Sequence, residues 1–380
     1  MHSAKELMIN YKLRWKERRY VRMRFFMPTA IRQERDCVTH HAEELAACGT
    51  TALIVTGRHS ARENGSLNDV IKALDAQCVQ YVVFDQVEEN PSVETVMAAR
   101  DAGLAAKADF VIGIGGGSPL DAAKAAALML AHPEKDWHYL YETADSAALP
   151  VAAVPTTCGT GSEVTGVAVL TRHDLGTKVS MTHRVFPVLA LVDGKYLLTA
   201  PQKILIHTAV DALAHLIESV INTHADAYSD MTAFAGLRGW NECRLYLTGE
   251  KVFTEQAAQQ LMHVSTLAGM SIAQTGTSIP HALSYILTAQ GGIPHGAAVG
   301  IFLANFVRYA EAGRRDAVLH AAGFPDAEAL RRTLSAWLSV KADRTLTERA
   351  AESVLRNPAK LNTCPYPINA QTMQQIISGI

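Results

Sequence analysis

Residues 109–124 read Asp-Phe-Val-Ile-Gly-Ile-Gly-Gly-Gly-Ser-Pro-Leu-Asp-Ala-Ala-Lys. The apolar run 109–114 is typical of a strand that is buried on both faces. Gly115, Gly116 and Gly117 follow it, so the backbone carries no side chains where a helix begins. The first N–H groups of a helix and the positive end of its dipole can bind a phosphate there. This stretch therefore predicts an α/β fold with a phosphate-binding turn.

The residues after the glycines suit the first turn of a helix. Ser118 can cap it, Pro119 fits its first position, and Asp121 completes a Ser-x-x-Asp capping pattern. The motif is neither GxGxxG nor a Walker A loop, because no Gly-Lys-Ser/Thr follows. From this stretch alone, a well-capped turn without a ligand is the alternative interpretation.

Short β-branched runs alternate with helical patterns on both sides of this turn, between about residues 50 and 200. The predicted strands are 51–56, 81–85, 109–114, 151–154 and 189–192, and the predicted helices are 68–75 and 93–107. Strands separated by helical crossovers predict a parallel sheet that is covered on both faces. Residues 167–171 and 179–181 flank Asp174-Leu-Gly176 and predict a β-hairpin.

The strand pattern stops at Pro201, and segments rich in Ala, Leu and Ile at helical spacing follow. A chain of 380 residues is long enough for two domains. The predicted division is a basic extension (1–24), an α/β dinucleotide-binding domain of Rossmann-like type (25–199) and an all-helical metal-binding domain (200–380).

Composition excludes several classes of protein. Hydrophobic residues make up 48%, charged residues 19%, and the net charge is −2, which is ordinary for a globular enzyme and gives no attraction to nucleic acid. No apolar run is long enough to span a membrane. The six cysteines show no paired spacing, so we expect free thiols and a cytoplasmic location.

The first 24 residues hold eight Lys/Arg against two Glu. A basic arm of this kind can bind RNA or a membrane surface. No apolar segment or cleavage site of a secretory signal follows it. A solvated extension is the favoured interpretation, with neither nucleic acid nor membrane as a partner.

A second polar loop, Pro155–Glu163, also follows a predicted strand. Its hydroxyl side chains at Thr156, Thr157 and Thr160 can bond a phosphate or a ribose. Two such loops at the carboxyl ends of parallel strands predict a shared nucleotide-binding crevice.

Four residues in the helical part suit a metal ion. Asp211 and His215 lie one helical turn apart on the same face, and His281 and His295 follow. One carboxylate and three imidazoles suit Fe²⁺ or Zn²⁺ and are poor ligands for Mg²⁺ or Ca²⁺. The chain has 15 His, so this spacing alone leaves the assignment open.

With these motifs in order, the chain resembles the iron-containing (group III) alcohol dehydrogenase family from Phe25 to about Val307. The matching motifs are Phe25–Pro28, Glu89–Pro91, Gly115–Lys124, Pro155–Thr165, Asp211–His215, and the pair His281 and His295. The resemblance implies that the metal, Fe²⁺ with Zn²⁺ as the alternative, is held by Asp211, His215, His281 and His295. The expected cofactor-binding residues are Gly57, Ser60, Asn90, Gly115, Gly116, Gly117, Ser118, Asp121, Thr156, Thr157, Thr160 and Lys178.

Two positions depart from the family pattern. Many NAD-using members have an acidic residue at the end of the first strand, where this chain has Gly57 followed by Arg58-His-Ser60. Because position 57 carries no carboxylate and Arg, His and Ser follow it, the ribose 2′-phosphate can be accommodated there. We therefore expect NADP rather than NAD. Four residues after His281, where many members have a His proposed to relay protons, this chain has Tyr285. His281 and Tyr285 are the catalytic candidates, and the route of the proton stays open.

The resemblance implies reversible hydride transfer between NAD(P)(H) and a small primary alcohol or aldehyde, with the metal as Lewis acid on the substrate oxygen. A homo-oligomer, namely a dimer, is expected. The alternatives are a polyol enzyme similar to glycerol dehydrogenase, an enzyme similar to dehydroquinate synthase, and a non-catalytic protein that binds nucleotide or nucleic acid. Between residues 205 and 300 the only cations are Arg238, Arg244 and Lys251, none beside a proposed ligand, which favours a substrate of low charge.

Overall fold

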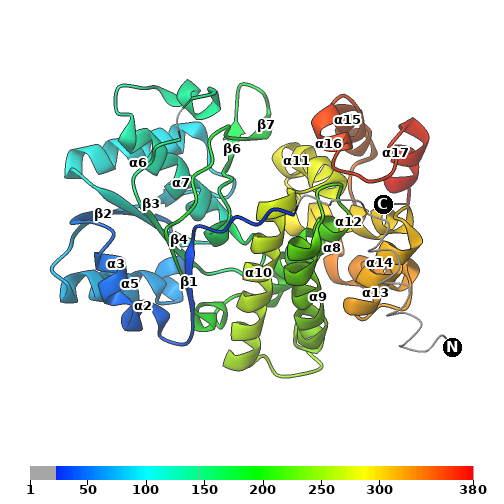
Figure 1. The fold of residues 1–380 in the computed structure, drawn as a ribbon, viewed down its shortest axis with the longest axis horizontal. Coiled ribbons are helices and arrows are strands. Elements are labelled where there is room, and N and C mark those ends of the chain that lie inside the picture. The colour runs from blue at the N-terminus through cyan, green and yellow to red at the C-terminus, as the bar shows by residue number, and fades with distance from the viewer. Residues whose placement is uncertain (1–22, 145, 380) are drawn as a thin grey trace.

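The computed structural model describes residues 23–144 and 146–379, and it places an α/β half beside a helical half (Figure 1). The interpretation of the basic extension falls mostly on residues 1–22, which lie outside the described residues. None of the described helices is long and apolar enough to cross a membrane.

The α/β half is built on a six-stranded sheet with the order β1-β8-β5-β4-β2-β3, and every pair of neighbouring strands is parallel. The strands are β1 (Ala30–Gln33), β2 (Thr51–Gly57), β3 (Gln80–Val87), β4 (Phe110–Gly115), β5 (Val151–Pro155) and β8 (Leu189–Val192). The five predicted strands are confirmed in this parallel sheet, and β1 was not predicted. A two-stranded antiparallel hairpin of β6 (Val169–Arg172) and β7 (Thr177–Ser180) is also confirmed.

Helices cover both faces of the sheet, as the alternating side chains of β2 show. Leu53 and Val55 pack into the core beneath α6 (Val93–Ala106) and α7 (Gly117–Ala131). Ala52 and Ile54 point the other way, toward α2 (Cys37–His40), α3 (Ala42–Ala46) and α5 (Ser66–Ala76). Because successive residues of a strand face opposite sides, one apolar run supplies two separate cores.

The predicted cap of α7 is wrong. The helix begins at Gly117 with Gly116 as its N-cap, and no side chain caps it. The Ser118 hydroxyl instead accepts a hydrogen bond from the backbone N–H of Asn90 at 3.0 Å. The glycines extend the helix two residues further than the capping pattern indicated, and they leave its first N–H groups without a side-chain partner.

The helical half starts with α8 (Gln202–Val220), which is buried along most of its length. The other helices are α9 (Ala227–Leu247), α10 (Glu255–Thr275), α11 (Ile279–Gly291), α12 (His295–Arg308), α13 (Ala312–Ala321), α14 (Ala327–Leu338), α15 (Arg344–Leu355), α16 (Pro358–Leu361) and α17 (Ala370–Ile376). Helices α9, α10 and α12 pack directly on α8. Residues on α8 therefore lie at the centre of this half.

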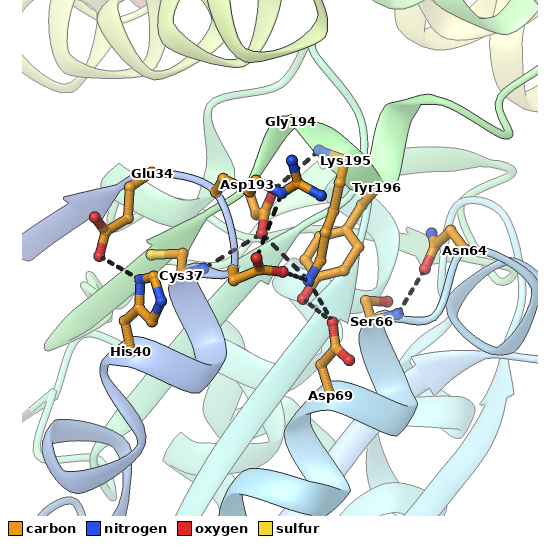
Figure 2. Close-up of polar contacts among 12 residues, drawn as sticks. Glu34, Cys37, His40, Asn64, Ser66, Asp69, Asp193, Gly194, Lys195 and Tyr196 are labelled. Atoms are coloured by element: carbon orange, nitrogen blue, oxygen red, sulfur yellow. Dashed lines mark hydrogen bonds and ion pairs between the residues drawn. The ribbon is translucent and has the colours of Figure 1, made fainter. Parts of the chain in front are cut away.

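A cluster of charged side chains fixes the carboxyl ends of β1 and β8 (Figure 2). The amine of Lys195 lies 2.6 Å from Asp36 Oδ1 and 2.9 Å from Asp69 Oδ2. The backbone N–H of Gly194 donates to the side chain of Gln259 on α10 at 2.6 Å. Lys195 thus links the end of β1 to α5. Gly194, the residue before it, links the α/β half to the helical half.

Candidate metal centre and nucleotide site

Three of the predicted metal ligands converge from three helices. Asp211 lies on α8, His281 in the first turn of α11, and His295 at the start of α12. One ligand atom from each lies within 4.8 Å of the others. Oδ1 of Asp211 is 3.3 Å from Nε2 of His281 and 3.7 Å from Nε2 of His295. Residues far apart in the sequence therefore present one carboxylate and two imidazoles to a common point.

These residues fit a divalent ion. Oδ1 of Asp211 and Nε2 of His281 are buried, and neither has a hydrogen-bond partner within the described part of the chain. Unpartnered buried polar atoms are costly, and two of them directed at one point can both be satisfied by a metal ion. The mixture of carboxylate oxygen and imidazole nitrogen suits Fe²⁺ or Zn²⁺.

The fourth predicted ligand, His215, lies beside this group and not within it. Its ring stacks on that of His281, with centroids 4.3 Å apart and an interplanar angle of 17°. Its Nδ1 atom is 3.1 Å from the carbonyl oxygen of Gly159, in the second polar loop. A hydrogen bond from Nδ1–H fixes the tautomer that leaves Nε2 with a lone pair. His215 also connects the metal helix to the α/β half.

A glycine next to His295 explains how α12 lies so close to α8. A Cβ atom at Gly296 would lie 1.9 Å from the carbonyl oxygen of His207. Only glycine lets the backbones of the two helices meet here. This close approach brings the first residue of α12 within reach of Asp211.

A second carboxylate, which the sequence analysis missed, holds His281 in place. Glu218 is fully buried on α8, and its Oε1 lies 2.6 Å from Nδ1 of His281. Its Oε2 accepts the backbone N–H of Ser278 at 2.5 Å. Asp211, His215 and Glu218 follow the i, i+4, i+7 spacing of one helix face, which is the signal that could have revealed it. A carboxylate behind a metal-binding imidazole orients the ring and raises its basicity.

The pKa values of the imidazoles differ. Burial lowers the pKa of His215 to about 4, and burial together with the Lys178 charge lowers that of His295 well below its usual range. Burial also acts against a charge on His281, but Glu218 and Asp211 outweigh it and raise its pKa to about 9. A metal that binds here must displace the proton of His281, so its affinity should rise as the pH rises.

The two predicted nucleotide loops touch each other at the carboxyl ends of β4 and β5. The backbone N–H of Thr156 donates to the carbonyl of Gly115 at 2.9 Å. A Cβ atom at Gly116 would lie 3.0 Å from Oγ1 of Thr157, and one at Gly117 would lie 2.9 Å from the Thr160 side chain. The glycines thus let the helix start pack against the hydroxyl-bearing loop, as a shared phosphate site requires.

Asp121 and Lys124 join these loops from α7. The carboxylate of Asp121 accepts hydrogen bonds from Ser162 Oγ at 2.5 Å and from Val169 N at 2.8 Å. The amine of Lys124 is fully buried and donates to Ser162 Oγ at 2.7 Å and to the Thr165 carbonyl at 3.2 Å. Both oxygens of Asp121 thus face protein donors, which indicates that it positions the second loop.

Lys178 lies between the nucleotide loops and the metal ligands. Its amine donates to Oδ1 of Asn90 at 3.0 Å and lies 5.6 Å from the ring centroid of Tyr285. Asn90 also bonds Ser118 of the glycine turn. The ring of Tyr285 in turn stacks near that of His295, with centroids 6.4 Å apart. A continuous set of contacts therefore connects the glycine turn to the metal group.

The structure limits what Tyr285 can do. Burial, with nearby carboxylates adding to its effect, raises the pKa of Tyr285 to about 12. The phenol is therefore protonated at neutral pH and can donate a hydrogen bond, but it does not act as a base there.

Gly57 is the last residue of β2, which lies next to β4 in the sheet, and Ser60 begins the short helix α4 (Ser60–Glu63). Arg58, His59 and Ser60 are exposed. Arg58 has no ion-pair partner within the described ranges. The carboxyl end of β2 therefore presents a cation and a hydroxyl, and no carboxylate at position 57.

Comparisons with known proteins agree with this geometry. The family described as iron-containing alcohol dehydrogenase matches residues 28–194, and the C-terminal part of the Fe-containing alcohol dehydrogenase family matches residues 205–376. The NADPH-dependent butanol dehydrogenase of Clostridium saccharobutylicum is 31% identical, over 69% of this chain and 68% of that protein. The bifunctional aldehyde-alcohol dehydrogenase of Escherichia coli K12 is 30% identical over 74% of this chain, which spans 33% of that longer protein.

The fold is also similar to solved structures. The crystal structure of an iron-containing alcohol dehydrogenase matches with a TM-score of 0.86 and 34% identity, covering 93% of this chain and 97% of the other. The similarity thus extends over both halves of the chain.

Proposed function

The chain belongs to the iron-containing alcohol dehydrogenase family, and we propose that it transfers hydride between NADPH and a short primary alcohol or aldehyde. The family activity is NAD(P)-dependent alcohol oxidoreduction. The named relative that uses NADPH and acts on butanol supports both the cofactor and a simple alcohol over a polyol. We further propose that residues 25–199 form the dinucleotide domain and residues 200–380 the metal domain.

The metal group carries this proposal. We propose Asp211, His281 and His295 as ligands, because their unpartnered atoms meet at one point. His215 completes the set through Nε2, since its Nδ1 is held by Gly159. Fe²⁺ is the proposed ion and Zn²⁺ the alternative. When bound, the ion supplies Lewis-acid polarisation of the substrate oxygen.

The chain's own residues supply position and hydrogen bonds. The glycine turn and the threonines of the second loop would hold the pyrophosphate, as the helix start and hydroxyls allow. Lys178, held by Asn90 beside Tyr285, would fix the nicotinamide side of the nucleotide relative to the metal ligands. Tyr285 would donate a hydrogen bond toward the reacting oxygen, since its phenol stays protonated. Correct placement of the reacting atoms is itself a large part of catalysis.

A screen of the anaerobically purified full-length protein tests the function. Metal content is measured per chain, and NADPH consumption is followed with short aldehydes of different chain length. We expect one metal ion per chain and NADPH oxidation with at least one aldehyde. Protein that holds metal but oxidises neither NADPH nor NADH with any aldehyde would contradict the proposal.

Cofactor preference is tested at Gly57. Gly57→Asp adds a carboxylate where the 2′-phosphate is expected, so it should raise KM for NADPH about tenfold or more and favour NADH. Gly57→Ala is the matched control. Its Cβ would lie 3.4 Å from the Val87 carbonyl, which is ordinary contact, and it adds no charge. Steady-state KM values for both cofactors decide the matter, and a lower KM for NADH than for NADPH in the unmodified protein would show that the assignment is wrong.

A further inference from the structure

One loop contacts both the glycine turn and the helix that carries two of the proposed metal ligands. It is the second loop, Pro155–Glu163. Its Thr157 side chain lies 3.0 Å from the position of a Cβ atom at Gly116. Its Thr160 side chain lies 2.9 Å from the corresponding position at Gly117. A phosphate bound at the start of α7 would therefore lie directly against this loop.

The other side of the loop rests on α8. A Cβ atom at Gly159 would lie 2.7 Å from the carbonyl oxygen of Thr208, so the two backbones are in close contact. The thiol of the buried Cys158 lies 3.2 Å from Oγ1 of Thr208. The carbonyl oxygen of Gly159 lies 3.1 Å from Nδ1 of His215. The loop thus reaches the proposed fourth ligand through its backbone.

The loop is also fixed on α10, in the helical half. A Cβ atom at Gly161 would overlap the Cα atom of Gly269, so these two backbones also touch. The hydroxyl of Thr266 donates to Oε1 of the buried Glu163 at 2.9 Å. Close-packed interiors absorb little displacement. A shift of the loop at the glycine turn must therefore also move the groups that it contacts on α8.

His215 is the proposed ligand that depends on this loop. Ligand atoms of Asp211, His281 and His295 already lie within 4.8 Å of one another, whereas His215 lies beside them. The Gly159 carbonyl is the only hydrogen-bond partner of the His215 ring among the described residues. The orientation of this ring, and with it the fourth bond to a metal ion, is therefore set by the loop.

We propose that the second loop couples the two sites, so that a nucleotide pyrophosphate bound at the glycine turn raises the affinity of the ligand group for its metal ion. This inference rests on the proposed function, which needs both sites. A pyrophosphate held by Thr157 and Thr160 would fix the backbone at Gly159 and thereby the ring of His215. Such a chain of packed and bonded groups can carry coupling between sites. By linkage, the metal must raise the affinity for the nucleotide by the same factor.

Calorimetry on the metal-stripped, full-length protein tests the coupling. The affinity for Zn²⁺ is measured without nucleotide and with saturating NADPH, 2′-phospho-ADP-ribose or 2′-AMP. We expect NADPH and 2′-phospho-ADP-ribose each to raise the Zn²⁺ affinity about tenfold, because both carry the pyrophosphate. 2′-AMP carries none and should leave the affinity unchanged. An effect of NADPH alone would mean that the nicotinamide acts directly on the metal site, and it would contradict the proposal.

His215→Phe tests whether the coupling passes through this residue. Phenylalanine keeps a ring that can stack on His281, but it has no nitrogen for the Gly159 carbonyl or for the metal. Zn²⁺ should bind more weakly, and 2′-phospho-ADP-ribose should no longer change its affinity. His320→Phe, at an exposed position on α13, is the matched control and should keep the tenfold effect.

Thr208→Val tests the loop while every proposed ligand stays in place. It removes the hydroxyl that contacts Cys158, so the factor should fall below about threefold. Thr208→Ser keeps the hydroxyl and should keep the factor. A role of Thr208 in folding alone would change the affinities but not their dependence on each other.

Two results would overturn the coupling and leave the proposed function standing. One is that the unmodified protein binds Zn²⁺ and nucleotide with no effect of either on the other. The second is that the full factor persists in both His215→Phe and Thr208→Val. Failure of NADPH and NADH to bind with or without Zn²⁺ would overturn the proposed function and the coupling together.

Discussion

Replacing His281 with alanine should remove the bound metal and lower kcat/KM for NADPH-dependent aldehyde reduction by at least about 1,000-fold. His281 contributes Nε2, a buried atom without a hydrogen-bond partner in the described structure, to the point where Asp211 and His295 converge. The substitution also leaves Glu218 buried without its imidazole partner. The loss of a metal ligand and the loss of the imidazole partner of the Glu218 carboxylate both lower metal binding and activity.

The measurement combines metal content per chain with steady-state kinetics. His320→Ala is the matched control, because it removes an exposed imidazole from α13. We expect the control to keep both metal and activity. Circular dichroism of His281→Ala shows whether the fold is retained. If a folded His281→Ala variant still turned over at the unmodified rate, the metal assignment could not stand.

Glu218→Gln should weaken metal binding by about 10- to 100-fold, which is the usual effect of losing a carboxylate behind a metal-binding histidine. The carboxylate accepts two hydrogen bonds, one from the Nδ1–H of His281 and one from the Ser278 N–H. A glutamine offers one acceptor, so its NH₂ group must face one of the two donors. The imidazole is then held less firmly and is less basic.

The effect of Glu218→Gln is measured by titrating metal-stripped protein with Fe²⁺ and with Zn²⁺. Activity at saturating metal should recover more fully than in His281→Ala, because all ligands remain. Glu242→Gln, at an exposed position on α9, is the control and should bind metal as the unmodified protein does. Unchanged metal affinity in Glu218→Gln would show that the carboxylate serves only to hold α11 in place.

The sheet was largely predictable because its central strands are continuous apolar runs. β2 and β4 were placed within a residue of their ends, since both are buried on two faces. β1 was not placed as a strand, because its four residues Ala-Ile-Arg-Gln carry little apolar pattern and lie at the edge of the sheet. The cap at Ser118 was wrong, because the glycines allow the helix to begin earlier than a side-chain cap would.

The site was predictable only in part. The glycine turn and the Asp211 and His215 pair follow local spacing, which a sequence displays directly. Glu218 lies on the same helix face, but its role is visible only from its hydrogen bond with His281, which comes from another helix.

The central claim is that one divalent ion, held at Asp211, His281 and His295, is required for turnover. The most direct measurement is a titration of chelator-stripped, full-length protein with Fe²⁺ under anaerobic conditions, in which NADPH-dependent aldehyde reduction is followed. The account predicts negligible activity without metal and a rise that levels off at one equivalent per chain. Full activity in the stripped protein, with no response to added metal, would contradict it.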